Sequence, residues 1–262
     1  MSFLHGGRPL PALLVAAGLV AACETVPYTG RSQLQLISPS EESQMGAEAY
    51  QQTLSKAKLS HDAAATEMVK RVGSRIAAVT GHPEYQWEYR LIDDDKTVNA
   101  FALPGGKVAV YTGILPVTRD EAGLAAVLGH EIGHVLARHG GERVSQQLIV
   151  NVGLETTMAA LSSGNPATVQ AVASLLGAGA SVGVLLPWSR VQESEADHLG
   201  LILMAKAGYD PRASRDLWVR MSQLPGASTK PPEFLSTHPA DPTRIRQIEG
   251  RLPEALQEYN PR

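Results

Sequence analysis

Residues 118–139 read TRDEAGLAAVLGHEIGHVLARH, and this stretch decides what kind of domain the chain forms. Its apolar residues recur at helical spacing and form one broad face, made of Leu124, Val127, Leu128, Ile132, Val135 and Leu136. Thr118 and Glu121 have the spacing of a capping box, which predicts where the helix begins. Gly140 and Gly141 predict its end after His139. We therefore expect a buried helix at the centre of the domain.

The middle of this helix carries the sequence His-Glu-Ile-Gly-His at residues 130–134, the pattern HExxH. Residues four apart lie on one face of a helix, about 6 Å apart along its axis, so His130 and His134 can both bind one Zn²⁺. Glu131 is rotated about 100° from His130 and would face the open side of the ion without binding it. The pattern predicts two zinc ligands and a general base. The alternative is a histidine pair that binds nothing.

A catalytic zinc site usually has three protein ligands and a water, so a third ligand is needed. Ser189 and Gln192 form a second capping-box pattern, which predicts a helix from that point. On this helix Glu193 and Asp197 are four residues apart and share a face. We assign Glu193 as the third ligand and Asp197 as the acceptor of an N–H from a zinc-bound imidazole. Glu195 is expected to point elsewhere, into solvent.

The rest of the chain predicts a mostly helical α+β domain. Amphipathic helices are expected at 41–57 and 62–79. Three short strands are expected at 86–92, 99–103 and 107–111, which would form a small sheet packed on the HExxH helix. Further helices are expected after Pro211 and after Pro242.

The segment 144–189 contains one charged residue, Glu155, and many glycines and alanines. A membrane-inserted hairpin is one interpretation of this composition. We favour two helices packed on the core, because the polar run at 162–166 and several amides and hydroxyls interrupt the apolar stretch. Residues 140–188 could also form a lid over the active site.

The first 22 residues are interpreted as a signal peptide. Arg8 precedes an apolar run at 10–22 that is too short to span a membrane, which takes about 20 residues. The end of this run, Val-Ala-Ala before Cys23, resembles the lipobox of bacterial lipoproteins, in which the cysteine is lipid-modified. The alternative is an ordinary cleaved signal in which Cys23 is incidental.

The lipobox implies a lipoprotein of the bacterial cell envelope that faces the periplasm and is held to the membrane by lipid on Cys23. Glu24 follows the cysteine, and we expect the outer membrane. Residues 23–40 are polar and contain prolines, so they are predicted to be a tether. Residues 41–262 would form the catalytic domain.

The composition of the 262 residues excludes several classes of protein. The 23 Lys and Arg do not outnumber the 26 Asp and Glu, so the chain has no positive charge excess with which to bind nucleic acid. A single cysteine excludes an intramolecular disulfide framework and any cysteine-rich zinc site. The sequence does not determine the oligomeric state.

The combination of HExxH, ExxxD about sixty residues later and His238-Pro239 resembles the gluzincin family. This family contains the CAAX prenyl proteases, the HtpX heat-shock peptidase and the periplasmic lipoprotein peptidases. Residues 98–106 and 207–211 resemble the segments that flank the family's metal-binding helices, and residues 28–38 resemble the mature N-terminus of the lipoprotein branch.

The resemblance implies a zincin-like domain with one Zn²⁺ per chain that hydrolyses peptide bonds. Carried over by position, the ligands are His130, His134 and Glu193, the general base is Glu131, and Asp197 supports a ligand. In such sites zinc lowers the pKa of a water to about 7, and the glutamate accepts its proton.

His238 has no role that the residues alone can assign, but the resemblance places it near the metal. It could stabilise the oxyanion during hydrolysis, or it could bind zinc as a fourth ligand and keep the enzyme latent. A turn histidine without a metal role is the third possibility.

We expect a zinc-dependent endopeptidase that acts on misfolded or misassembled envelope proteins, and this substrate class rests on the resemblance alone. A protein or peptide substrate could add a strand beside 99–103, although an ordinary buried strand is equally compatible with that sequence. One alternative is a periplasmic chaperone or assembly factor with a latent or structural zinc site. Another is an envelope scaffold that does not depend on the metal.

Overall fold

A computed structural model describes residues 23–161, 189–227 and 231–261 of the chain. The predicted signal peptide at 1–22 lies outside the described residues, as does 162–188 of the predicted lid. The described chain is mostly helical with small sheets, which confirms the predicted fold class.

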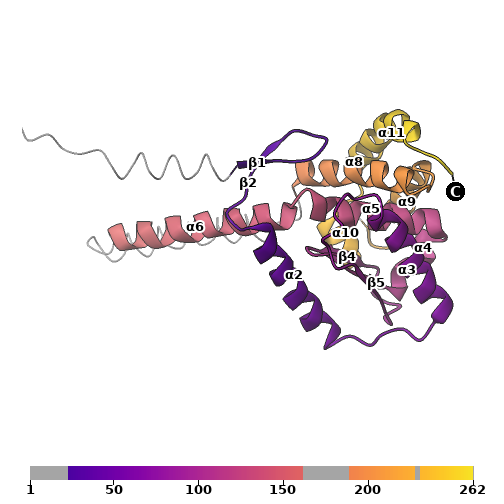
Figure 1. Ribbon diagram of the computed structural model, residues 1–262, viewed down its shortest axis with the longest axis horizontal. Coiled ribbons are helices and arrows are strands. Elements are labelled where there is room, and N and C mark those ends of the chain that lie inside the picture. The colour runs from indigo at the N-terminus through magenta and orange to yellow at the C-terminus, as the bar shows by residue number, and fades with distance from the viewer. Residues whose placement is uncertain (1–22, 162–188, 228–230, 262) are drawn as a thin grey trace, which may run out of the picture.

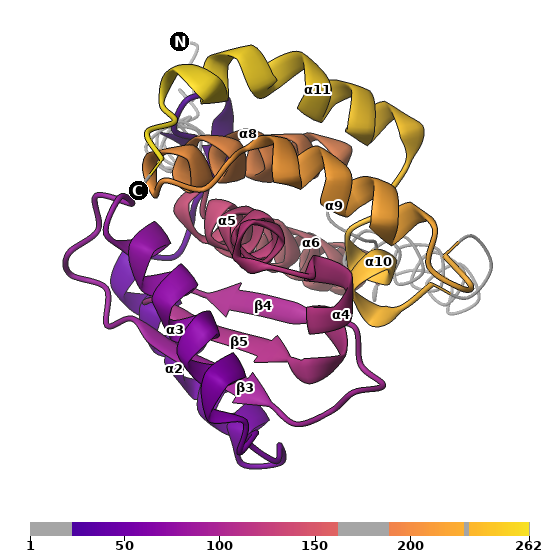
Figure 2. The same cartoon turned by 90° about the vertical axis from the view of Figure 1, so that its right-hand side faces the viewer.

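The larger sheet has three strands in the order β3-β5-β4. β3 (Glu88–Ile92) pairs in parallel with β5 (Lys107–Tyr111), and β5 pairs antiparallel with β4 (Ala100–Leu103). All three strands lie within the predicted ranges. β4 is at one edge of the sheet, and the helix that carries HExxH runs beside it (Figure 2).

Two helices precede the sheet, and they confirm the predicted amphipathic pair. α2 (Pro39–Leu54) begins with a capping box formed by Ser38 and Glu41, and α3 (Ala63–Ala77) is capped by the Asp62 side chain. α3 buries one apolar face, with Val69, Val72 and Ile76, in the main core. The Tyr50 hydroxyl donates to the Val108 carbonyl at 3.0 Å, which ties α2 to the central strand.

The HExxH helix is α5 (Glu121–Leu136), and it is buried along almost its whole length. Its N-cap is Asp120, whose side chain accepts from the Gly123 N–H, so the predicted cap at Thr118 is wrong. Thr118 instead ends the short helix α4 (Leu115–Thr118), where its hydroxyl donates to the Leu115 carbonyl. A 3₁₀ turn, η1 (Thr112–Ile114), connects β5 to α4.

The predicted stop at Gly140 and Gly141 is also wrong. α5 ends at Leu136, and both glycines lie in the first turn of the next helix, α6 (His139–Leu161). Arg138 separates the two helices with a left-handed φ of 53°. Its guanidinium donates to the Glu42 carboxylate and to the Ile37 carbonyl, and these contacts favour this backbone conformation.

α8 (Arg190–Lys206) crosses α5 at very short range, and Ser189 and Gln192 form its predicted capping box. A Cβ added at Gly129 would lie 2.9 Å from the Gly200 carbonyl oxygen, and one added at Gly133 would lie 2.7 Å from the Ala196 carbonyl oxygen. Only glycine permits this approach. The crossing brings the HExxH turn of α5 against the first turns of α8.

Three C-terminal helices complete the domain: α9 (Arg212–Ser222), α10 (Glu233–Thr237) and α11 (Pro242–Gln257). α11 begins after the Asp241 cap and lies over α8 and α9 (Figures 1 and 2). Helices after Pro211 and Pro242 were predicted and are confirmed.

The segment predicted as a tether, 23–40, is folded in the structure. β1 (Cys23–Thr25) and β2 (Ser32–Leu34) form an antiparallel hairpin, and α2 already begins at Pro39. The buried Gln33 side chain donates to the Ala137 carbonyl at 2.7 Å, so the hairpin is fastened to the end of α5. The tether prediction is wrong because polar side chains in this segment find buried partners on the domain.

α6 extends away from the other helices (Figure 1). It exposes Leu148, Ile149 and Val150. Among the described residues, no helix has both the length and the apolar character that a membrane span requires. The lid prediction for 140–188 is not tested, because most of that segment is outside the described residues.

Candidate active site

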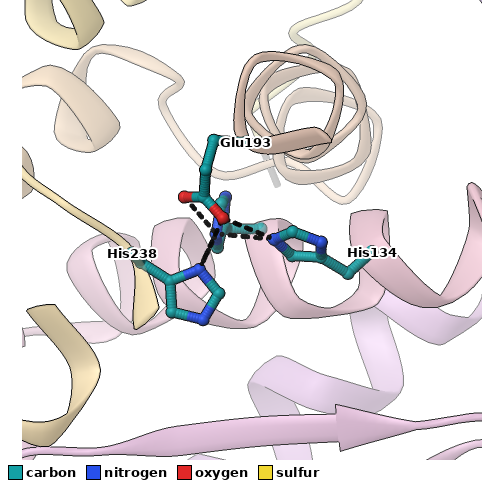
Figure 3. Close-up of side chains that lie close together, drawn as sticks. His134, Glu193 and His238 are labelled. Carbon is teal, nitrogen blue, oxygen red and sulfur yellow. Dashed lines mark hydrogen bonds and ion pairs between the residues drawn. The ribbon is translucent and has the colours of Figure 1, made fainter. Parts of the chain in front are cut away.

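Four buried side chains from three parts of the chain meet where α5 and α8 cross. They are His130 and His134 of α5, Glu193 of α8, and His238 directly after α10. One ligand atom from each lies within 4.8 Å of all the others (Figure 3). The sequence predicted the first three as ligands and left His238 open.

The donor atoms of these four side chains are close enough together to hold one metal ion. His134 Nε2 lies 3.2 Å from His130 Nε2 and 3.2 Å from Glu193 Oε1. His238 Nδ1 lies 2.8 Å from Glu193 Oε1 and 3.1 Å from His130 Nε2. Around a tetrahedral Zn²⁺ with bonds of 2.0–2.1 Å, neighbouring ligand atoms are about 3.3 Å apart. The nitrogen and oxygen donors present fit zinc in kind, and four of the six distances between them are close to this value.

The two α5 histidines present Nε2 to the centre of the site and use Nδ1 for outer contacts. His130 Nδ1 lies 3.0 Å from Asp197 Oδ1, the partner that the sequence analysis expects for a ligand histidine. His134 Nδ1 lies 2.9 Å from His139 Nδ1. Burial lowers the pKa of His134 well below its ordinary value, so this imidazole is neutral and has a lone pair to offer.

Arg244 of α11 is a site residue that the sequence analysis missed. It is 5% exposed, and its guanidinium lies 3.3 Å from the centre of the Trp218 ring. It donates to both oxygens of Asp197 at 2.8 Å and lies 2.6 Å from Glu193 Oε2. No local pattern marks this arginine, because its partners are on a helix 47 residues or more away along the chain.

Arg244 controls the charge of both carboxylates. Burial alone would raise the pKa of Glu193, but Arg244, His238 and His130 outweigh it and hold that pKa far below its ordinary value. Burial likewise opposes ionisation of Asp197, and Arg244 together with His130 lowers its pKa. Both groups are therefore carboxylates at neutral pH.

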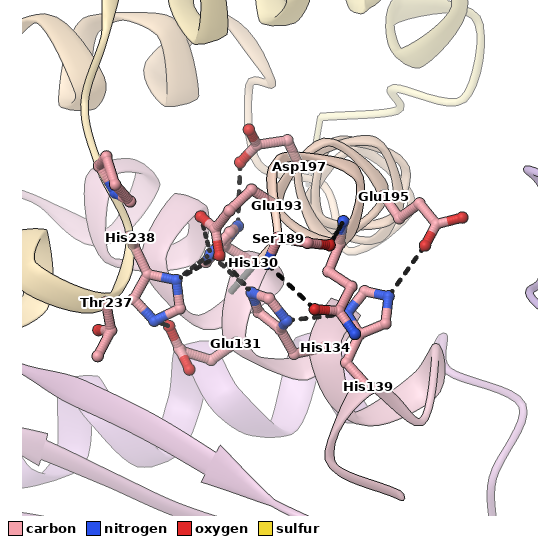
Figure 4. A network of polar contacts seen from close by, with 12 residues as sticks. His130, Glu131, His134, His139, Ser189, Glu193, Glu195, Asp197, Thr237 and His238 are labelled. Carbon is pink, nitrogen blue, oxygen red and sulfur yellow. Dashed lines mark hydrogen bonds and ion pairs between the residues drawn. The ribbon is translucent and has the colours of Figure 1, made fainter. Parts of the chain in front are cut away.

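Glu131 is buried beside the four-residue cluster and is not part of it (Figure 4). Its Oε1 makes no hydrogen bond within the described part of the chain and lies 3.5 Å from His238 Nε2. Burial raises the pKa of Glu131, while the charges of His238 and His130 and the backbone of Ala102 oppose the rise. A carboxyl group with a raised pKa and an open acceptor atom is suited to proton transfer.

The expectation that Glu195 faces solvent is wrong. Glu195 is 3% exposed and accepts hydrogen bonds from Thr29 and Arg31 of the N-terminal hairpin. Its Oε2 lies 3.1 Å from His139 Nε2 (Figure 4). Helical spacing alone could not show this, because the partners come from β-hairpin residues that are remote in the sequence.

The strand predicted to receive substrate, 99–103, lies at the sheet edge. Within the described chain β4 pairs only with β5, so its other side has no strand partner. The effect of the Ala102 backbone on Glu131 shows that β4 runs next to this carboxyl group. The Phe234 N–H donates to the Val98 carbonyl at 3.2 Å, which connects the start of the strand to α10.

Comparison with known proteins identifies relatives over most of the chain. Mitochondrial metalloendopeptidase OMA1 of Schizosaccharomyces pombe is 41% identical over 235 residues, which cover 88% of this chain and 67% of that protein. OMA1 of Saccharomyces cerevisiae is 36% identical over 186 residues, or 66% of this chain and 49% of that protein. Beta-barrel assembly-enhancing protease of Escherichia coli is 28% identical over 241 residues, or 90% of this chain and 49% of that protein.

The matched regions thus span between about half and two thirds of these relatives. The model for peptidase family M48 matches residues 63–252. This range contains the HExxH helix, the helix of Glu193 and Asp197, and His238. The residues that meet in the structure are therefore the ones that the family match covers, and the chain belongs to peptidase family M48.

Proposed function

We propose that this protein is a zinc-dependent endopeptidase with one zinc per chain, held by His130, His134 and Glu193. The observation that carries the proposal is the cluster of buried nitrogen and oxygen donors, within 4.8 Å of one another, with Glu131 directly beside them. Membership in peptidase family M48 and the names of the metalloendopeptidase relatives support it. A chaperone with a structural zinc would not need a buried carboxyl group with an open acceptor atom at this place.

Zinc, when bound, would polarise the substrate carbonyl and make a water acidic enough to act at neutral pH. Glu131 would accept the proton of that water and later donate it to the leaving amine. Asp197 and Arg244 would hold His130 and Glu193 in place through the contacts described above.

An extended peptide would bind along β4 by adding a strand to the open edge of the sheet. Backbone hydrogen bonds supply most of the recognition in this mode, so side chains would be selected only loosely. This property suits a peptidase that acts on unfolded segments of many proteins.

The function is tested by elemental analysis of the full-length protein together with hydrolysis of casein, an unfolded protein. We expect about one zinc per chain and hydrolysis that is lost when a chelator removes the metal. Protein that holds no zinc would contradict the metal assignment. Zinc-loaded protein that cleaves nothing, both as wild type and as His238→Ala, would favour the chaperone alternative.

For His238 we propose the role of a fourth ligand that keeps the resting site closed. Its Nδ1 points into the cluster, at 2.8 Å from Glu193 Oε1 and 3.1 Å from His130 Nε2, and would there take up a fourth coordination position on the zinc. A substrate carbonyl would have to displace it.

His238→Ala is therefore expected to weaken zinc binding about tenfold, in line with the loss of one ligand contact, and to raise the rate of casein hydrolysis at saturating zinc. Competition with a chelator measures the zinc affinity, and initial rates measure casein hydrolysis. His61→Ala, which changes an exposed loop histidine, is the matched control. A fall in kcat of about 10²–10³-fold with unchanged zinc affinity would instead assign His238 to oxyanion stabilisation.

We also propose that the protein is a lipoprotein of the bacterial envelope, anchored through Cys23, with misfolded or misassembled envelope proteins as substrates. The lipobox-like sequence before Cys23 supports the anchor. The name of one group of bacterial relatives, beta-barrel assembly-enhancing protease, supports the substrate class. Mass spectrometry of the purified protein for acyl groups on Cys23 distinguishes this anchor from an incidental cysteine.

A further inference from the structure

A line of buried polar contacts leads from His134 to the N-terminal hairpin. His134 Nδ1 lies 2.9 Å from His139 Nδ1, and His139 Nε2 lies 3.1 Å from Glu195 Oε2. Glu195 accepts from Arg31 Nε, at 3.0 and 2.9 Å to its two oxygens, and from the Thr29 hydroxyl at 2.7 Å. Figure 4 shows the inner part of this line, from His134 through His139 to Glu195.

The inner members of this line are shielded from water. His139 is 0% exposed and Glu195 is 3% exposed. In such surroundings each polar group depends on the partner that the fold provides, because water cannot replace a lost hydrogen bond.

The guanidinium of Arg31 also pairs with a second carboxylate. Its Nη1 and Nη2 donate to the two oxygens of Glu142 on α6, at 2.7 and 2.8 Å. The Gln192 amide donates to the same carboxylate at 2.7 Å. Arg31 is therefore clamped between a carboxylate of α6 and one of α8, which fixes the guanidinium opposite Glu195.

The sequence of contacts from His134 through His139 to Glu195 indicates which atom donates and which accepts in each hydrogen bond. With zinc bound at Nε2 of His134, the hydrogen of this ring is on Nδ1, where it donates to His139 Nδ1. The hydrogen of His139 is then on Nε2, where it donates to the Glu195 carboxylate. Each ring thus has one tautomer, and the orientation of each is determined by the next group outward.

The two α5 histidines are consequently supported in different ways. His130 contacts the carboxylate of Asp197 directly, whereas His134 reaches the carboxylate of Glu195 through the intervening imidazole of His139. Partners of this outer kind determine the tautomer and basicity of a ligand histidine.

We propose that His139, Glu195 and Arg31 are positioning residues for His134, and that the N-terminal hairpin is thereby part of the metal site. The proposal rests on the zinc peptidase function and names residues beyond the ligands and the general base. It also connects the site to the anchor, because β1 of the same hairpin begins at Cys23.

The test uses the full-length protein with Arg31→Gln, and zinc affinity is measured by competition with a chelator. We expect an affinity that is weaker by up to about tenfold, the lower end of the effect of partners outside the ligand set, and a lower kcat with little change in KM. Thr29→Val removes one hydrogen bond to Glu195 and leaves the charges in place, so a smaller loss is expected.

Gln35→Ala is the matched control. Gln35 fastens the same segment through a 2.9 Å hydrogen bond to the Arg138 carbonyl, and its side chain makes no hydrogen bond to Glu195 or His139 in the described chain. We expect zinc affinity to stay at the wild-type value. The thermal midpoint of each metal-free variant shows how far the fold itself has been weakened.

A second pair of variants separates positioning from packing. In His139→Asn the amide oxygen lies close to the position of Nδ1 and can accept from His134, whereas His139→Leu has no acceptor. We expect the asparagine variant to recover a large part of the zinc affinity that the leucine variant loses.

Wild-type affinity in both Arg31→Gln and His139→Leu would overturn the proposal and leave the peptidase function intact. An equal loss in Gln35→Ala and Arg31→Gln would overturn it as well, since docking of the hairpin alone would then explain the effect. If the wild-type protein itself holds no zinc, the proposed function has failed, and that result is obtained before any variant is made.

Discussion

Glu131→Gln is expected to reduce casein hydrolysis by about 10²–10⁴-fold while the protein retains about one zinc per chain. Glutamine has the same shape as glutamate, but its amide cannot accept and return a proton at neutral pH. The loss would therefore fall on the chemical step.

The position of Glu131 explains why its substitution should impair catalysis and leave zinc binding intact. Glu131 is buried next to the cluster of His130, His134, Glu193 and His238, yet it contributes no atom to that cluster. Its Oε1 lies 3.5 Å from His238 Nε2 and makes no hydrogen bond in the part of the chain that is described. Burial raises its pKa, which brings the carboxyl group closer to the neutral pH at which a general base must work.

The measurement is kcat on casein with zinc content determined on the same samples. Glu48→Gln makes the same chemical change on the exposed face of α2 and should keep full activity. Wild-type kcat in Glu131→Gln would exclude this residue as the base. Loss of zinc from Glu131→Gln would show that the residue supports the metal instead.

Arg244→Leu is expected to lower the free energy of unfolding of the metal-free protein by about 3–5 kcal/mol. The substitution leaves the carboxylates of Glu193 and Asp197 buried without the cation that neutralises them. It also removes the guanidinium from the face of Trp218. Removing one partner from a buried ion pair is costly because the remaining charge cannot be hydrated.

The measurement is urea unfolding at pH 7 in the presence of a chelator, so that zinc does not contribute. Arg212→Leu is the control, because Arg212 also pairs with an aspartate, Asp210, but its side chain is 64% exposed. Water screens that pair, and a much smaller loss is expected. Equal losses in the two variants would contradict the assignment of Arg244 as the counterion of the site.

The difference between wild type and Arg244→Leu should depend on pH in a defined direction. The pKa values of Glu193 and Asp197 are lowered in the folded protein, so their contribution to stability is present above their ordinary pKa of about 4 and declines as the pH falls below it. Without Arg244 these pKa values should rise. The difference in free energy of unfolding between wild type and Arg244→Leu is therefore expected to become smaller when unfolding is measured at pH values below about 4.

Local patterns predicted the elements of this fold well. The alternation in 86–111 predicted three strands, and the Ser189–Gln192 capping box predicted the start of α8. The capping-box pattern assigned the cap of α5 to Thr118, and the structure assigns it to Asp120. The signals that predicted correctly depend on residues within one strand or one helical turn, whereas both predicted ends of α5 were wrong.

The sequence by itself determined the helical turn that carries HExxH, since His130, Glu131 and His134 are placed by the helical period alone. It also predicted Glu193, because its spacing from Asp197 places two carboxylates on one face of a helix. Only the tertiary structure decided what surrounds them: Arg244 on both carboxylates, and the line from His139 to the N-terminal hairpin. The reason is physical. Periodicity within one helix depends on backbone geometry, whereas a buried charge finds its partner through the packing of remote segments, which no local pattern records.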